Sequence, residues 1–277
     1  MREDNYLYGC KNADCVPSQI EHHPEPEDPA EPSLGHDSKS VWRYRYEIAM
    51  WKLLGPILVS RMISKARKKI AILKSIDDAL DFAWSFSYVV RSICPAQVRS
   101  EFATLLAKAS ETKPKYVLEI GTANGGTLFL FTRIASPDAM IISVDLPGGK
   151  FGGGYPESLA PLFKSFGKEG QTIQLLRADS HDAGTLSKVK DMLAGNALDL
   201  LFIDGDHSYE GVKRDFEMYS PLVKKGGIVA IHDIAKHPAN VGCEVDRFWK
   251  EVKDVHPYTE VLADPKATWA GIGILQM

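Results

Sequence analysis

Two stretches in the second half of the chain end in clusters of ionisable residues. Leu200–Tyr209 (LLFIDGDHSY) and Gly226–Asp233 (GGIVAIHD) each contain an apolar run that finishes in acids and a histidine. Two carboxylates with an imidazole or a water can hold a divalent cation, and magnesium in particular accepts one or two carboxylates plus waters and substrate oxygens. We therefore expect Asp204, His232 and Asp233 to hold a divalent metal. Magnesium is the expected ion, but an imidazole is a poor ligand for magnesium. Either the metal is a softer one, or His232 does not bind the metal directly and instead contacts the residues that do.

His207 lies in the first of these stretches. An imidazole titrates near neutrality, so it can accept a hydroxyl proton, and a metal on the same oxygen would lower the pKa of that proton. The alternative is a histidine that caps the helix expected to begin near Tyr209. The sequence favours the catalytic interpretation and leaves the other open.

A third stretch, Tyr116–Thr127 (YVLEIGTANGGT), reads as a buried strand, a tight turn and the start of a helix. Gly121, Gly125 and Gly126 would let the backbone approach a ligand, toward which the helix directs its free N–H groups. The stretch lacks the Gly-x-Gly-x-x-Gly order of dinucleotide-binding loops. It therefore suits an uncharged or zwitterionic ligand better than a pyrophosphate.

The apolar segment Ile141–Asp145 ends in an acid, and a carboxylate at the end of such a strand can accept hydrogen bonds from both hydroxyls of a ribose. The alternative is an acid that follows the strand by chance. Together with Tyr116–Thr127, this segment resembles motifs I and II of the class I S-adenosylmethionine-dependent methyltransferases. The resemblance implies S-adenosylmethionine as cofactor and Asp145 as its ribose ligand. It places these residues around the methionine end of the cofactor: Glu119, Gly121, Thr122, Asn124 and Gly125.

The acidic stretches sharpen the resemblance. Ile203–His207 followed by Gly-Gly-x4-His-Asp is similar to the catechol O-methyltransferase-like branch, and more narrowly to the macrocin O-methyltransferase and cephalosporin hydroxylase-related group. This similarity implies Asp204 and the pair His232 and Asp233 as metal ligands and His207 as general base. The pattern usually has an acid at the position of His232. This departure affects the expectation of a bound metal more than the expectation of methyl transfer.

A further segment, Ala178–Ser180, resembles the part of these enzymes that meets the adenine amino group. It implies Asp179 and Ser180 as cofactor residues, and the alternative is a capping loop before a helix near Thr185. The resemblance covers about residues 95–277, in which the segment around Gly121 and the Asp-Gly-Asp-His segment are the specific parts.

Strands and helices alternate from Tyr116 onward, which indicates a parallel sheet covered on both faces. We expect an α/β fold, a doubly wound and mostly parallel seven-stranded sheet with an N-terminal helical extension. The expected strands are Tyr116–Ile120, Met140–Asp145, Ile173–Arg177, Asp199–Asp204, Ile228–His232, Thr259–Leu262 and Gly271–Leu275. The expected helices are Thr127–Ile134, Glu157–Phe166, Thr185–Met192, Tyr209–Tyr219 and Val241–Val252.

The chain divides into three parts by composition. Residues 1–40 are acidic and proline-rich and are expected to be disordered. Residues 41–110 have helical periodicity without strand signals, and they could form a lid over the site or a surface for homo-oligomerisation. Residues 111–277 form the cofactor-binding domain. The glycine-rich segment 145–155 is either a mobile cover over the site or an ordinary linker.

Composition narrows the partners. The net charge is −3 and no long basic run occurs, so nucleic acid is not an expected partner and a small molecule is. The apolar segment Ile48–Ile63 is too short to cross a membrane and contains two bases, which argues against membrane contact. The four cysteines are too few and too scattered to indicate a disulfide framework, and the first residues resemble no secretory signal, so the expected location is the cytoplasm.

These observations lead to one hypothesis with two rivals. We expect an S-adenosylmethionine-dependent enzyme that methylates a hydroxyl of a small molecule, such as a sugar or a natural product, with a divalent metal. A nicotinamide-dependent oxidoreductase would share the architecture but would need the missing dinucleotide glycines. A cofactor-binding scaffold without catalysis would not need to retain Asp204, His207 and Asp233.

Overall fold

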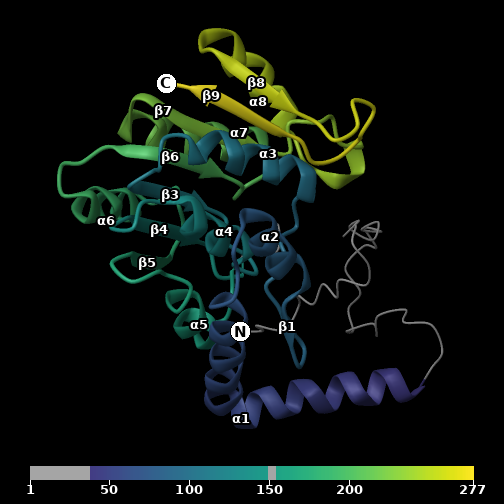
Figure 1. Cartoon of the computed structure of the whole chain (residues 1–277). Coiled ribbons are helices and arrows are strands. Elements are labelled where there is room, and N and C mark those ends of the chain that lie inside the picture. The colour runs from purple at the N-terminus through teal and green to yellow at the C-terminus, as the bar shows by residue number, and fades with distance from the viewer. Residues whose placement is uncertain (1–37, 149–153) are drawn as a thin grey trace.

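The computed structural model describes residues 38–148 and 154–277 and shows a seven-stranded sheet flanked by helices (Figure 1). The expected fold class is confirmed. In spatial order the strands are β5 (Thr172–Arg177), β4 (Met140–Asp145), β3 (Tyr116–Ile120), β6 (Leu198–Ile203), β7 (Val223–His232), β9 (Ile272–Gln276) and β8 (Tyr258–Val261). Only β9 runs against the other strands of this sheet.

The direction in which the strands are added reverses between β3 and β6. From β3 the chain continues outward to β4 and β5, whereas β6 returns to the other side of β3 and is followed by β7. In open α/β sheets a ligand crevice lies beyond the carboxyl ends of the strands at such a reversal. The fold therefore places the loops after Ile120 and Ile203 beside each other.

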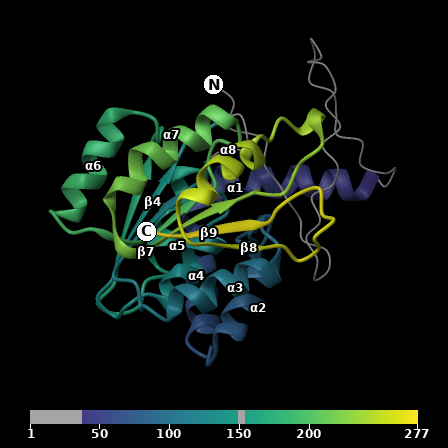
Figure 2. The same cartoon turned by 90° about the horizontal axis from the view of Figure 1, so that it is seen from above.

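Helices cover both faces of the sheet, and the strand residues alternate between two apolar cores. Val117 belongs to the core that contains residues of α2, α3 and α4, and its neighbour Leu118 belongs to the core beneath α7 and α8. Figure 2 shows the two helical layers on opposite sides of the strands. The helices are α1 (Ser38–Ile70), α2 (Ile76–Ser85), α3 (Arg99–Ser110), α4 (Gly126–Ile134), α5 (Ala160–Lys164), α6 (Ala183–Leu193), α7 (Tyr209–Tyr219) and α8 (Val245–Val252).

The helices before the sheet pack into its core. Rings of Phe102 from α3, Phe131 from α4 and Phe202 from β6 lie 5.5–5.6 Å apart between centroids, so the N-terminal region and the sheet share one aromatic cluster. Ser75 and Asp78 form a reciprocal capping box at the start of α2. None of the helices in the described ranges is both long and apolar enough to span a membrane.

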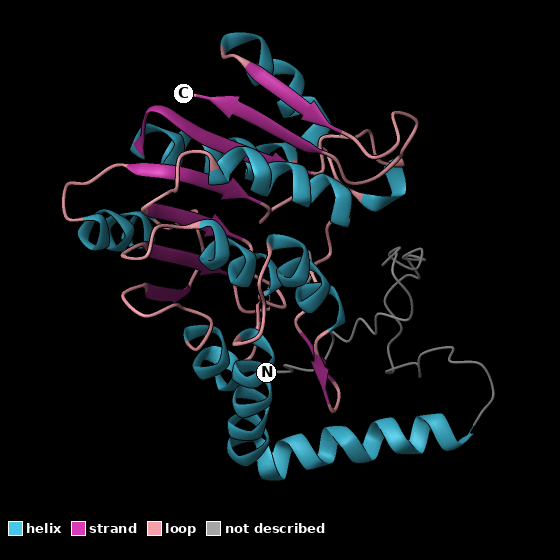
Figure 3. Ribbon diagram, in the orientation of Figure 1, coloured by secondary structure: helices cyan, strands magenta, loops and turns pink. Residues whose placement is uncertain are grey.

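Helix α1 has two segments that meet at a steep angle (Figure 3). Pro56 lies inside α1 and cannot donate the backbone hydrogen bond of a regular helix, which gives a local cause for bending.

The structure corrects the expected secondary structure at three places. A two-stranded hairpin, β1 (Ser87–Tyr88) with β2 (Arg91–Ser92), interrupts the region in which only helices were expected. Strand β7 begins five residues before the expected start at Ile228. Helix α8 begins at Val245, not at Val241, because Gly242 has a left-handed backbone (φ 72°) that a helix does not accommodate. Residues 1–37 of the expected tail and 149–153 of the glycine-rich segment lie outside the described residues.

Gly121 offers a test of the sheet's central contact. It has φ 90°, and a Cβ at this position would lie 1.8 Å from the carbonyl oxygen of Asp204. Gly226 also has positive φ (79°) but has open space around the same direction. We expect Gly226→Ala to cost about 1–2 kcal/mol for the backbone conformation alone. Gly121→Ala should cost clearly more in denaturant unfolding, and equal losses in both variants would show that the contact with Asp204 is easily relieved.

Candidate active site

The loops after β3 and β6 meet at the carboxyl edge of the sheet. The backbone N–H of Asp204 donates to Ile120 O (2.8 Å), and that of Gly121 donates to Val144 O (2.9 Å). Gly121 is therefore required where the two loops touch, since any side chain would collide with Asp204. This contact fixes the cofactor loop expected at Gly121 against the acidic stretch that begins at Asp204.

The other two glycines of the loop make room for protein. A Cβ on Gly125 would lie 2.5 Å from the ring of Phe163, and one on Gly126 would lie 2.2 Å from Ile93 O. The expectation that all three glycines serve close approach of a ligand is therefore not needed for these two. Gly125 also takes a left-handed conformation (φ 83°) at the N-terminus of α4.

Side chains of the loop are largely engaged with the protein. The hydroxyl of Thr122 is buried and pairs with that of Ser143 on β4, and Asn124 Nδ2 donates to Cys94 O (3.0 Å). What the loop can offer a ligand comes mainly from its backbone and from the N-terminus of α4.

Two buried acids flank this loop. Glu119 has no exposed surface, and among the described residues neither of its carboxylate oxygens has a hydrogen-bond partner of good geometry. Burial raises the pKa of Glu119 from its usual value of 4.5 to about 8. Asp145, at the end of β4, accepts a hydrogen bond from the N–H of Ala123 (2.8 Å), and burial raises its pKa to about 6. Both carboxyls lie where a cationic ligand would relieve the cost of their burial.

The segment after β5 is more exposed. Asp179 accepts a hydrogen bond from the N–H of His181 (2.8 Å), and Ser180 O accepts one from the hydroxyl of Tyr219 (2.7 Å). Asp182, not Asp179, caps the following helix. The segment therefore leads into the helix cap, as the alternative expected, and Asp179 and Ser180 stay predicted contacts of the adenine.

The residues expected to carry chemistry converge after β6 and β7. Asp204 Oδ1 lies 3.0 Å from His232 Nδ1 and 3.5 Å from His207 Nε2. Asp233 lies 3.3 Å from both rings, through Oδ2 to His207 Nδ1 and through Oδ1 to His232 Nδ1. His207 thus bridges two carboxylates with its two ring nitrogens. Since Ser208 provides the side-chain cap of α7, His207 is not the cap that the alternative interpretation required.

The backbone holds this cluster in place. Asp233 has a left-handed conformation (φ 64°), which is costly for a residue with a side chain and turns the chain sharply at the end of β7. The N–H of Glu244 donates to His207 O (2.8 Å), which ties the loop between β7 and α8 to the loop between β6 and α7.

The carboxylates and histidines of the cluster shift one another's pKa values in opposite directions. Burial alone would raise the pKa of Asp204 and of Asp233, but the neighbouring histidines hold both below the usual value, and that of Asp233 well below. Burial alone would likewise lower the pKa of His207 and His232, but the two carboxylates raise both, and that of His232 well above its usual value. The two carboxylates therefore favour the protonated form of His207.

Three further side chains in the cluster were missed in the sequence. Gln97, which precedes α3, donates from Nε2 to Asp204 Oδ2 although 107 positions separate the two residues. His237 Nε2 lies 3.5 Å from Asp233 Oδ1, and hydrogen bonds to Asp233 and Cys243 raise the pKa of His237 to about 10 against the effect of burial. Cys243 groups with His207 and Asp233. His237 and Cys243 follow Asp233 by four and ten residues, and that proximity is the only signal the sequence offered.

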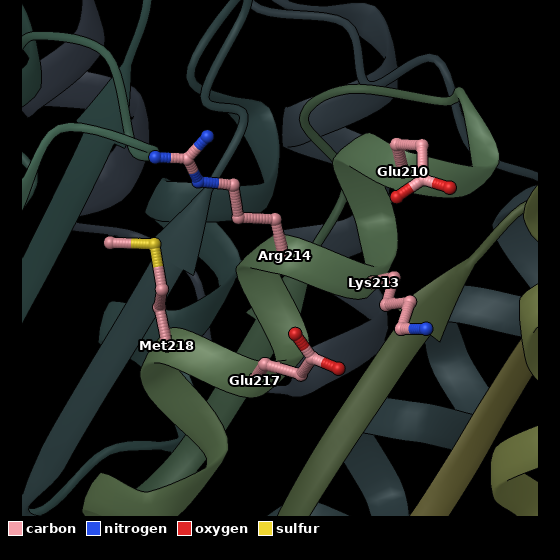
Figure 4. A pocket seen from close by; sticks show the side chains of 5 residues that line it. All are labelled: Glu210, Lys213, Arg214, Glu217 and Met218. Carbon is pink, nitrogen blue, oxygen red and sulfur yellow. The ribbon is translucent and has the colours of Figure 1, made fainter.

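A separate hollow lies on the outer face of α7 (Figure 4). All five side chains that line it come from this helix, and two are acids and two are bases. The side chains on this mixed, solvated helix face do not converge on one point, so we do not regard it as a functional site. The residues that line the hollow are Glu210, Lys213, Arg214, Glu217 and Met218.

Comparison with known proteins agrees with this geometry. Residues 118–234 match a sequence family described as "Methyltransferase domain". The chain is 31% identical over 134 residues to uncharacterised protein R132 of Acanthamoeba polyphaga mimivirus, which covers 46% of this chain and 55% of that protein. It is 27% identical over 149 residues to uncharacterised protein y4gI of Sinorhizobium fredii, covering 52% of this chain and 16% of that protein. The chain therefore spans about half or less of each of these two relatives.

Solved structures with similar folds include two O-methyltransferases. TomG of Streptomyces achromogenes, in complex with SAM, has 16% identity and a TM-score of 0.49, over 79% of this chain and 97% of that chain. An O-methyltransferase of Bacillus cereus, in complex with SAH, has 14% identity and a TM-score of 0.49, over 79% of this chain and 100% of that chain.

The family match begins within β3 and ends just after β7, so it contains the loop at Gly121, the acid Asp145 and the cluster at Asp204 and Asp233. The strand order and the position of these residues at the carboxyl edge agree with that match. Over residues 118–234 the chain is therefore similar to methyltransferase domains.

Proposed function

We propose that the protein transfers the methyl group of S-adenosylmethionine to a hydroxyl oxygen of a small molecule, such as a sugar or a natural product. The observation that carries this proposal is the contact between the loops of Gly121 and Asp204, which sets a histidine–carboxylate cluster beside the cofactor loop. An acceptor at this edge would face both the methyl donor and a group that takes up its proton.

The cofactor would lie along the carboxyl ends of β3, β4 and β5. In this proposal Asp145 accepts hydrogen bonds from the ribose, and Asp179 and Ser180 contact the adenine. Glu119 lies beneath the loop that would surround the methionine end, where its buried carboxyl would favour a cofactor that carries a sulfonium and an ammonium group. The loop residues Gly121, Thr122, Asn124 and Gly125 would contribute mainly through their backbone.

The reaction is an in-line displacement in which the bond from sulfur to the methyl carbon breaks as the bond from oxygen to that carbon forms. The hydroxyl proton passes to His207, which acts as general base. Asp233 Oδ2 would accept from His207 Nδ1–H and hold the ring, and Nε2, which faces Asp204 Oδ1 at 3.5 Å, would receive the proton once it is released from that carboxylate. His207 must first lose the extra proton that the two carboxylates stabilise.

The donor set also fits a divalent cation. One ligand atom from each of Asp204, His232 and Asp233 lies within 4.8 Å of the others, and His232 faces the two carboxylates through Nδ1, 3.0 Å from Asp204 Oδ1 and 3.3 Å from Asp233 Oδ1. When bound, such an ion would stabilise negative charge on the acceptor oxygen. The two carboxylates suit magnesium, whereas the imidazole favours an ion that accepts nitrogen.

The first prediction concerns the cofactor. Asp145→Asn should weaken S-adenosylmethionine binding in calorimetric titration by roughly 10- to 100-fold, since hydrogen bonds to a charged group contribute about 1.5–3 kcal/mol. Asp138→Asn is the control, because Asp138 is an exposed acid before β4, at the opposite edge of the sheet. Unchanged affinity in Asp145→Asn would remove the ribose assignment, and tighter binding of NAD than of S-adenosylmethionine would favour the oxidoreductase.

The second prediction concerns proton transfer. An acceptor is first identified by screening hydroxylated small molecules for production of S-adenosylhomocysteine. His207→Ala should then lower kcat by about 10²–10⁴-fold while S-adenosylmethionine still binds. Chelation should also lower turnover, and the two losses should overlap because they act on one oxygen. His256→Ala, outside the cluster, is the control. Parental turnover in His207→Ala would end its role as base, and full activity in chelator would exclude the metal.

The third prediction concerns the buried acid Glu119. Its raised pKa means that the folded protein binds a proton there that the unfolded chain releases above about pH 4.5, so the parent protein loses stability as pH rises from about 5 to 8. Glu119→Gln keeps the shape without the charge, so its melting temperature relative to the parent should rise steadily over that range. Val117→Ala, a neutral change on the same face of β3, controls for lost packing. A difference that does not vary with pH would contradict the protonated state.

A further inference from the structure

A second group of metal-ligating side chains lies on the loop between β7 and α8. Asp233, His237 and Cys243 come from this loop, and ligand atoms of His207, Asp233 and Cys243 all lie within 4.8 Å of one another. His237 adds a fourth side chain, with Nε2 3.5 Å from Asp233 Oδ1. The group shares only Asp233 with the ligand set assigned from the sequence, and it alone contains sulfur.

The ring of His237 is oriented as metal-binding histidines are. Its Nδ1 lies 2.9 Å from Ala235 O, and because a carbonyl oxygen can only accept, Nδ1 carries the proton. A backbone carbonyl on one ring nitrogen fixes the tautomer and leaves the lone pair of the other nitrogen for a metal. That nitrogen, Nε2, faces the carboxylate of Asp233, and the side chain of His237 is only 8% exposed.

Cys243 completes the set from the far end of the loop. It is a free, buried cysteine, and its thiol contacts the ring of His237. Glu244, the next residue, donates from its N–H to His207 O, so the chain is held against the loop of His207 at this point. Gly242 (φ 72°) sets the backbone turn immediately before the cysteine and keeps it out of α8. These contacts fix the backbone on both sides of Cys243.

We propose that Asp233, His237 and Cys243 bind a thiophilic divalent cation, zinc or an ion of similar preference, with its fourth position facing His207. One oxygen, one nitrogen and one sulfur ligand suit zinc and exclude magnesium by their chemistry. Three protein ligands with one open position are typical of catalytic rather than structural zinc sites. The ion would also join the end of β7 to the start of α8 across a loop with little regular structure.

The site is tested on the full-length, metal-stripped protein with cobalt as the probe, because cobalt bound to a thiolate gives a charge-transfer absorption that oxygen and nitrogen ligands do not. We expect about one equivalent of cobalt with this absorption, and its loss when zinc is added in competition. Binding without the thiolate absorption, or no binding, would overturn the proposal. Neither S-adenosylmethionine nor an acceptor is needed, so the outcome is independent of whether the methyl-transfer proposal holds.

Variants then assign the ligands. Cys243→Ser should abolish the thiolate absorption, and His237→Gln should weaken cobalt binding by more than about 100-fold, since loss of an outer hydrogen-bond partner alone costs about 10–100-fold. Asp204→Asn, which alters only the ligand set assigned from the sequence, should retain the thiolate absorption, and His256→Gln is the matched histidine control. Retention of the absorption in Cys243→Ser, or its loss in Asp204→Asn with the fold intact by circular dichroism, would refute the assignment.

Discussion

The contact between the ends of β3 and β6 is the constraint on which the site depends. Gly121 fits against Asp204 only because it has no side chain, and the hydrogen bond from Asp204 N to Ile120 O extends the pairing of the two strands by one step beyond the sheet. These are the strands at which the order of the sheet reverses. As a result, the loop that would hold the methyl donor and the residues that would handle the acceptor's proton belong to one rigid unit.

Buried acids at this edge divide into two kinds. Asp204 and Asp233 face histidines, whose positive charge lowers the pKa of both carboxyls. Glu119 and Asp145 have no such partner, and burial raises the pKa of both. A cationic ligand beside Glu119 and Asp145 would therefore find two carboxyls whose ionised forms it can stabilise. S-adenosylmethionine has that charge, through its sulfonium and ammonium groups, whereas a pyrophosphate would be repelled.

Short-range patterns predicted the parts of the structure that depend on local sequence. The apolar runs that became β3 and β4 have the expected boundaries, and the rule that parallel strands present their carboxyl ends at one edge brought Asp204, His232 and Asp233 together as expected. Contacts between residues far apart in the sequence could not be predicted from the sequence. Gln97 reaches Asp204 from the N-terminal region, and His237 and Cys243 depend on a loop path that Gly242 sets by a left-handed turn. A helix predicted from Val241 would have carried Cys243 away from the cluster.

Asp233 couples the two halves of the site. Its carboxylate faces His207, His232 and His237, and its left-handed backbone directs the chain from the end of β7 into the loop that bears Cys243. A strained conformation of this kind persists only where surrounding contacts hold it. Here those contacts are the three rings and the hydrogen bond from Glu244 N to His207 O. The carboxylate of Asp233 therefore both orients the proposed base and fixes the loop. Binding of a cation or a proton to this carboxylate from the side of His237 would change the negative charge that faces His207.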